Sequence, residues 1–287
     1  MNDIVTKISI KNILLNTILS IIKVTAGSFA GSLAVLSDGF NSLSDVATTI
    51  TILISRKFTN KPSDTDHPYG HEKIESMVVF SVAIFLVAVA LYTIYQSVLN
   101  LAGKNVITGS LFALVASAFS AIVKFYMYHS TEKVAKEIDS DSLRIIAADY
   151  KFDVFLSMSV FVGVLFTMFG WWFFEPIAAI VASVILFLSA AEFMKKAFNQ
   201  VVDKAADDET IESIRKIVMD CNGVIRIDLI KTRLHGRFIY VDIEISVDPD
   251  ITVKSGHSIA QKVHDVIEGN KSLNVIHCNV HVNPFED

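Results

Sequence analysis

The chain has 287 residues, of which 52% are hydrophobic and 19% are charged, and its mean hydropathy is +0.49. A chain of this composition is too apolar for an ordinary soluble enzyme, and the composition indicates an integral membrane protein. The formal net charge of -5 gives the chain no overall basic character, so we expect no nucleic acid as a partner.

The sequence contains six apolar stretches, which we call spans one to six in chain order. A helix needs roughly 20 residues to cross a bilayer, and each span reaches or nearly reaches this length. They cover residues 8–30, 33–54, 74–101, 109–128, 143–168 and 173–194. Lysine and arginine gather at the amino terminus and after spans two, four and six, which predicts that both termini are cytoplasmic. We therefore expect a multi-pass protein of the cell membrane, with a six-helix transmembrane domain over residues 1–200.

Residues 201–287 contain no further span and form a separate predicted domain. Amphipathic helices are predicted over 208–221 and 253–268, and strands over 224–232, 237–247 and 274–283. Alternation predicts one buried strand face of Ile239, Val241, Ile243 and Ile245, and another of Ile276, Cys278, Val280 and Val282. The order αββαβ predicts a small ferredoxin-like α+β domain, and a core this small is expected to gain stability from dimerisation.

Polar side chains interrupt spans two and five at a regular spacing. Asn41 and Asp45 lie in span two, and Asp149 and Asp153 lie in span five. Each pair is spaced i, i+4, so its two side chains share one helical face. Carboxylates inside a membrane are costly and persist mainly where they face a cavity or bind a cation. The four oxygen donors together favour a hard divalent cation such as Mn2+.

The same polar groups could instead hydrogen-bond between helices or pair with a lysine of the spans, namely Lys23, Lys124 or Lys151. Lys151 is two residues from Asp149 and points about 200° away from it on a helix, so we do not expect it to neutralise that pair. Asp38 lies on the same helical face as the first pair. We expect it either in an outer vestibule or as a helix-packing partner.

A second group of metal-binding residue types follows span two. Asp64, His67 and His71 lie in the segment Asp-Thr-Asp-His-Pro-Tyr-Gly-His-Glu-Lys of residues 64–73. They could form a mixed nitrogen and oxygen metal site, or a loop held together by its own polar side chains. The sequence has no nucleophile paired with a base and no phosphate-binding glycine loop, so we expect no enzyme.

These features together resemble the cation diffusion facilitator family over nearly the full chain. The resemblance rests on six helices with both ends inside, ligand pairs on helices two and five, the His-Pro-Tyr-Gly-His-Glu-Lys loop of residues 67–73, and the C-terminal domain. It implies a homodimer in the lipid bilayer that exports divalent cations from the cytoplasm in exchange for protons by alternating access. It implies no cofactor beyond the transported metal.

The resemblance also implies roles for individual residues. The transport site falls on Asn41, Asp45, Asp149 and Asp153. Zinc-exporting relatives usually have histidine at the position of Asp149, so this set resembles the manganese branch and Mn2+ is the expected cargo, with Zn2+ as the alternative. Some relatives hold zinc at the loop positions of Asp64, His67 and His71, and form a charge pair between helix three and the tail at the positions of Lys73 and Asp203.

The C-terminal domain of residues 201–287, called the tail, departs from the zinc-binding pattern of the family. Asp228 and Asp242 stand where some zinc relatives have histidine, His281 is retained, and Asn283 replaces a carboxylate. The tail site is therefore expected at Asp228, Asp242 and His281 if it binds a harder ion, or to bind no metal.

Two alternatives to manganese export remain. The cargo could be Zn2+, Fe2+ or Co2+, because ligand softness only biases selectivity. The chain could also be a membrane-anchored metal sensor or scaffold that does not transport.

Overall fold

The structure is a computed structural model that describes residues 2–58, 64–71, 73–103, 110–138, 141–236 and 238–286. It separates into two compact units. The first, called the membrane unit, contains Met1–Leu53 and Val79–Met194, and the second, called the tail unit, contains Ile54–Val78 and Lys195–Asp287. The predicted starts of span four at Gly109 and of the second strand at Arg237 lie outside the described residues.

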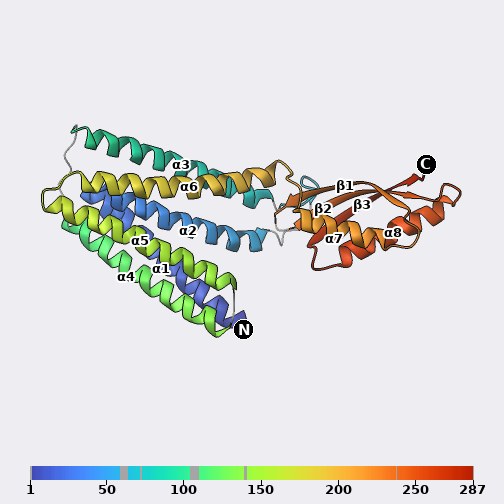
Figure 1. Cartoon of the computed structure of the whole chain (residues 1–287), viewed down its shortest axis with the longest axis horizontal. Coiled ribbons are helices and arrows are strands. Elements are labelled where there is room, and N and C mark those ends of the chain that lie inside the picture. Colours follow the sequence, from blue (N-terminus) through green and yellow to red (C-terminus); the bar gives the residue numbers. More distant parts are fainter. Residues whose placement is uncertain are drawn as a thin grey trace. The chain divides into compact units, whose positions relative to one another are not determined.

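Six long helices occupy the positions of the six predicted spans (Figure 1). They are α1 (Asn2–Ala30), α2 (Leu33–Phe58), α3 (Lys73–Leu101), α4 (Leu111–Glu137), α5 (Asp141–Met168) and α6 (Phe174–Val201). Among the described residues, five helices are long and apolar enough to cross a membrane, and α2 is not one of them. Helix α2 carries Asp38, Asn41 and Asp45, which lower its mean hydropathy. The predicted six-helix membrane fold is confirmed.

A sharp turn separates α1 from α2. Gly31 adopts a positive φ of 66°, a conformation that glycine adopts without strain, and the Ser32 N–H donates to the Gly27 carbonyl at 2.9 Å. Glu175, at the start of α6, accepts hydrogen bonds from the Ala34 N–H at 3.0 Å and from the Ser32 hydroxyl at 2.9 Å. A carboxylate of α6 therefore caps the first turn of α2, whose N–H groups have no partner within the helix.

Small residues form the centre of the membrane unit. One buried cluster contains Ala34, Ala113, Ala116, Ala178, Ala179 and Ala182, and small side chains of this kind let membrane helices approach closely. One close backbone approach joins α1 to α2, where a Cβ added at Gly27 would lie 2.7 Å from the backbone nitrogen of Leu36. That nitrogen belongs to the backbone of α2, so the contact cannot relax by a change of rotamer.

The tail domain has the predicted αββαβ order. Its elements are α7 (Asp208–Met219), β1 (Arg226–His235), β2 (Phe238–Val247), α8 (Val253–Gly269) and β3 (Val275–Pro284). The sheet order is β1-β2-β3, with β1 antiparallel and β3 parallel to β2. Both helices cover the same face of the sheet (Figure 1). The small α+β domain expected from the sequence is confirmed.

One strand face differs from the prediction. Ile239, Val241, Ile243 and Ile245 are buried as expected, but the expected burial of Ile276 is wrong, because its side chain is 41% exposed. The β2–β3 pairing shifts here: Ile239 pairs with Val275, and the next residue of β2 pairs with His277. Ile276 is thus the extra residue of a bulge, and Val275 is buried in its place.

The close contact between α1 and α2 predicts an effect of added bulk. We expect Gly27→Val to destabilise the protein by about 1–3 kcal/mol, because the new side chain would push against the α2 backbone. The neighbouring Ser28 is exposed, so Ser28→Val adds comparable bulk without that clash and serves as the control. Thermal unfolding of the detergent-purified protein measures both, and equal melting temperatures for the two variants would contradict this packing.

Candidate functional site

Three of the four predicted transport-site residues lie together in the membrane unit. Asp45 of α2 and Asp153 of α5 both contact the ammonium of Lys124, a residue of α4: Nζ lies 3.1 Å from Asp45 Oδ2 and 2.5 Å from Asp153 Oδ2. Asn41, one turn before Asp45, donates from Nδ2 to Asp153 Oδ1 at 3.1 Å. Helices α2, α4 and α5 thus meet at one polar site within an apolar bundle.

The site is partly open. The Lys124 side chain is fully buried, whereas the side chains of Asp153 and Asp45 are 14% and 34% exposed. Asn41 presents its amide nitrogen to Asp153, and its amide oxygen is the atom that could bind a cation. An ion can therefore reach the exposed oxygens of Asp45 and Asp153. The buried Lys124 closes the other side of these carboxylates.

Asp149 is separate from this group. It lies one turn before Asp153 on α5 and its side chain is exposed. Among the described residues, the carboxylates of Asp45, Asp149 and Asp153 do not form a cluster with ligand atoms within 4.8 Å of one another. The structure therefore brings together Asn41, Asp45 and Asp153, and it does not bring Asp149 into contact with them.

Asp38 forms a second buried ion pair, with Lys23 of α1. Lys23 Nζ lies 2.9 Å from Asp38 Oδ2, and the Ser157 hydroxyl donates to the same oxygen at 2.9 Å. Lys23 also donates to the Ser42 hydroxyl at 3.0 Å. With only 2% of its side chain exposed, Asp38 joins α1, α2 and α5 through these bonds.

From the sequence alone, Lys124 is only one of three lysines that could pair with the carboxylates. Its position in the site follows from the packing of α4 against α5, which lie side by side (Figure 1). One signal was present in the sequence: Lys124 is the single charged residue in the predicted span 109–128. A lone charge in a membrane helix is by default a candidate functional residue.

Asp64, His67 and His71 form a compact cluster in the tail unit. Their ligand atoms all lie within 4.8 Å of one another, and this is the only such group of three or more found among the described residues. His67 Nδ1 lies 3.2 Å from Asp64 Oδ1, and His71 Nε2 lies 3.4 Å from Asp64 Oδ2. The cluster offers one carboxylate and two imidazoles, a donor set that suits zinc.

Hydrogen bonds within the loop hold this cluster in place. The backbone N–H of His67 donates to Asp64 Oδ1 at 2.8 Å, and this bond lowers the pKa of Asp64 to about 2. Asp64 is therefore an ionised ligand at neutral pH. Nδ1 of the buried His71 has no hydrogen-bond partner in the described part of the chain, which leaves one nitrogen of that ring unsatisfied.

Lys73 and Asp203 are in contact within the tail unit. Lys73 Nζ lies 2.7 Å from Asp203 Oδ1, and the two side chains are 35% and 49% exposed. Asp203 has a positive φ of 57° just after α6, a conformation that aspartate tolerates better than most residues. Exposed pairs of this kind contribute about 0–1 kcal/mol, so the bond orients the two segments more than it stabilises them.

The predicted tail residues share one sheet face but do not form one cluster. Asp228 accepts hydrogen bonds from the Ser246 hydroxyl at 2.6 Å, from Arg226 Nε at 2.7 Å and from Asn283 Nδ2 at 3.1 Å. Asp242 is opposite Lys231 and Asn279, whereas His281 is opposite Glu244. Asp228 thus already has three donors from β1, β2 and β3, which is the bonding of a structural carboxylate.

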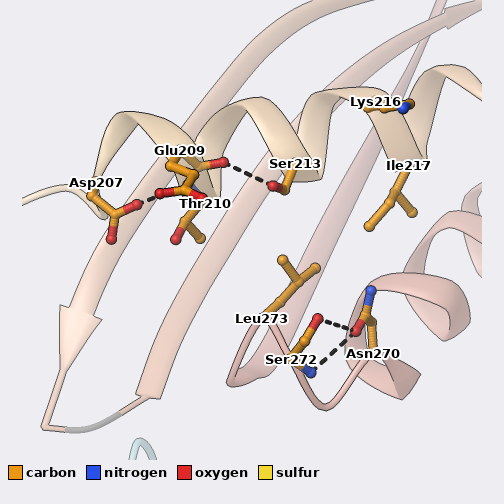
Figure 2. Close-up of a pocket in the computed structure, with 9 residues that line it drawn as sticks. All are labelled: Asp207, Glu209, Thr210, Ser213, Lys216, Ile217, Asn270, Ser272 and Leu273. Atoms are coloured by element: carbon orange, nitrogen blue, oxygen red, sulfur yellow. Dashed lines mark hydrogen bonds between the residues drawn. The ribbon is translucent and has the colours of Figure 1, made fainter. Parts of the chain in front are cut away.

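A cavity of about 520 Å³ lies beside α7 in the tail domain (Figure 2). Some of its polar side chains are used in local bonds: Asp207 accepts from the Thr210 N–H at 2.8 Å as the cap of α7, and Asn270 accepts from the Ser272 hydroxyl at 2.7 Å. The cavity is therefore bounded by helix-end and turn structure, and we assign it no ligand.

Comparison with known proteins identifies the family. Residues 9–202 match the family model of the cation efflux transmembrane domain, and residues 206–285 match that of the cation efflux protein cytoplasmic domain. The chain belongs to the cation diffusion facilitator family. Members of this family are cation efflux transporters rather than enzymes, so metal efflux by a multi-pass membrane protein is established for the chain at the level of the family.

Curated relatives of this family align with nearly the whole chain. The manganese efflux system protein MneP of Bacillus subtilis is 33% identical over 97% of this chain and 96% of its own length. MneS of the same organism, also named a manganese efflux system protein, is 26% identical over 94% and 92%. The magnetosome protein MamB of Magnetospirillum gryphiswaldense is 28% identical over 87% and 84%.

One solved structure of a similar domain is a cadmium form of the MamM CTD. It is 24% identical to this chain, covers 28% of this chain and 96% of its own, and has a TM-score of 0.27.

The bonds of Asp228 predict a pH effect on the tail of this facilitator. Donation from Ser246, then from Arg226 and Asn283, lowers the pKa of Asp228 from 3.8 to about 2. The stability this contributes is fully present above pH 3.8 and is lost as the pH falls through about 2. We expect the melting temperature of wild type to fall more steeply over this range than that of Asp228→Asn, as measured by circular dichroism.

The exposed Asp250, in the loop after β2, provides the control for this measurement. Asp250→Asn should keep the steep fall of wild type, and a parallel fall for wild type and Asp228→Asn would contradict the effect.

Proposed function

We propose that this facilitator exports Mn2+ from the cytoplasm in exchange for protons, through a site made of Asn41, Asp45, Asp149 and Asp153. The observation that carries the proposal is the meeting of Asn41, Asp45 and Asp153 from α2 and α5 inside the membrane unit. Oxygen ligands from two separate helices allow a bound ion to hold these helices together. The fourth ligand, Asp149, completes the site by a movement of α5 or a change of its own rotamer.

The donor set supports manganese as the cargo. All four proposed ligands bind through oxygen, which hard cations prefer, and none is a histidine or cysteine. Two relatives of the chain are named as manganese efflux proteins. Manganese is therefore the proposed cargo of this chain, because its own site residues are of the chemical type that binds hard cations.

The carboxylates also support proton exchange. Metal ions and protons compete for the same carboxylate lone pairs, so binding of one releases the other. In the proposed cycle the site binds metal from the cytoplasm, opens to the opposite side, and releases metal as protons arrive. Both termini are cytoplasmic in this proposal, residues 1–200 form the transport domain, and residues 201–287 form the dimerisation and regulatory domain of a homodimer.

The loop cluster favours a second candidate cargo. Asp64, His67 and His71 combine two imidazoles with one carboxylate, and this donor set binds zinc more readily than manganese. In this alternative, the loop supplies zinc to the same transport site. The two candidates differ in which metal crosses the membrane, so one flux assay separates them.

The identity of the cargo is tested by metal flux into inside-out proteoliposomes under an imposed pH gradient. We expect manganese to be transported faster than zinc by wild type. We expect Asp149→His to shift the preference toward zinc, because imidazole is a better ligand for zinc than for manganese. Transport of zinc alone by wild type would contradict manganese as the cargo, and flux that does not respond to the pH gradient would contradict the exchange.

The site itself is tested by removing one carboxylate at a time. We expect Asp45→Ala and Asp153→Ala to reduce manganese flux to the level of empty vesicles and still to give folded dimers, because the remaining carboxylate can still pair with Lys124. The exposed Glu137, at the end of α4, gives a control, since Glu137→Gln also removes one negative charge. Wild-type flux in either alanine variant would rule out this site.

A further inference from the structure

Lys124 lies between Asp45 of α2 and Asp153 of α5, which are two carboxylates of the proposed transport site. Its fully buried ammonium is 3.1 Å from Asp45 Oδ2 and 2.5 Å from Asp153 Oδ2. A divalent ion bound by oxygen ligands lies about 2.0–2.6 Å from each of them. An ion shared by these two oxygens would therefore take nearly the same place as the ammonium, and the two cations cannot bind both oxygens together.

A second buried lysine of the membrane unit, Lys23, is bonded differently. Lys23 pairs with one carboxylate, Asp38, and is also bonded to the hydroxyls of Ser42 and Ser157. That group has one positive and one negative charge, and its polar atoms are bonded to one another. Lys124 instead bridges two carboxylates, Asp45 and Asp153. Its ammonium is thus shared between two acidic side chains, whereas the ammonium of Lys23 is paired with one.

The surroundings of Lys124 offer its ammonium a second position. The ring of Tyr150 on α5 lies 5.5 Å from Lys124 Nζ, within the range in which a cation is attracted to an aromatic face.

The charges of the site also balance when the divalent ion and the ammonium are both present. A divalent ion and the ammonium together carry as much positive charge as Asp45, Asp149 and Asp153 carry negative charge, so metal binding does not require the ammonium to leave the site.

We propose that Lys124 is a tethered competitor of the transported cation: its ammonium exchanges with the divalent ion at Asp45 and Asp153 and moves toward Tyr150 when the ion binds. This inference rests on the proposed function, because it takes those two carboxylates as metal ligands. The competition weakens metal binding and speeds metal release, since the returning ammonium replaces the ion at the carboxylates. Lys124 is in this sense a residue that sets affinity and turnover.

Substitution of Lys124 tests the proposal in the purified full chain and in proteoliposomes. We expect Lys124→Met to bind Mn2+ at least about tenfold more tightly in equilibrium titration, because the competing charge is gone. In manganese flux, both KM and kcat should fall, since a more tightly held ion leaves more slowly. Lys124→Arg keeps the positive charge and should retain a Kd near that of wild type.

A matched control removes a second buried ion pair of the membrane unit, Lys23 with Asp38. The double variant Lys23→Met with Asp38→Asn eliminates both charges of that pair at once, and we expect its Kd for Mn2+ to equal that of wild type. Tighter binding in this control as well as in Lys124→Met would mean that the effect does not come from competition at Asp45 and Asp153, and it would overturn the proposal.

The remaining outcomes separate this inference from the proposed function. Unchanged or weaker Mn2+ binding in a folded Lys124→Met protein would overturn the competitor role and leave Lys124 as a purely structural pair. If Lys124→Met does not fold, Lys124→Gln removes the charge with a polar side chain, and the same tightening is required of it. Asp45→Asn tests the site independently: full transport by that variant would refute the transport site itself, whatever Lys124 does.

Discussion

Two carboxylates from separate helices share one ammonium inside the membrane unit, and this contact constrains how α2, α4 and α5 pack. Charges in a medium of low dielectric constant are stable only when they are paired and hydrogen-bonded. Asp45 of α2 and Asp153 of α5 meet this condition through Lys124 of α4. Helices α2, α4 and α5 therefore have to pack together at this level, and the small residues of the bundle allow their backbones to come close.

The tail unit meets a different requirement. Its core is apolar and two helices cover only one face of the sheet, so polar side chains on the other face can bond along and between strands. Asp228 shows this most clearly, because it accepts from residues of all three strands. The loop cluster differs in that its ligand atoms converge while Nδ1 of the buried His71 has no partner among the residues that the structure describes. The loop is thus better suited to hold a metal ion than the predicted tail site.

The elements of the fold could be predicted because they are encoded locally. Long apolar runs define the helices, and alternation defines the strands of the tail. The exposure of Ile276 could not be predicted, because a bulge arises from the pairing of β2 with β3. For the same reason, spacing identified the faces of α2 and α5 but not the partners across helices. The packing of the helices decides that Lys124 bridges two carboxylates and that Lys23 binds Asp38. It also decides that Asp149 remains apart from Asp45.

The cap of α2 has a mechanical consequence. Glu175 of α6 accepts from the Ala34 N–H and the Ser32 hydroxyl, and its side chain is almost fully buried. Helix α2 is thereby anchored at the end where it begins, whereas Asn41 and Asp45 lie two to three turns further along it. If these bonds persist while α2 tilts, α2 acts as a lever with its fulcrum at Glu175. The displacement then grows along the helix, so Asp45 travels further than Asn41 for the same tilt.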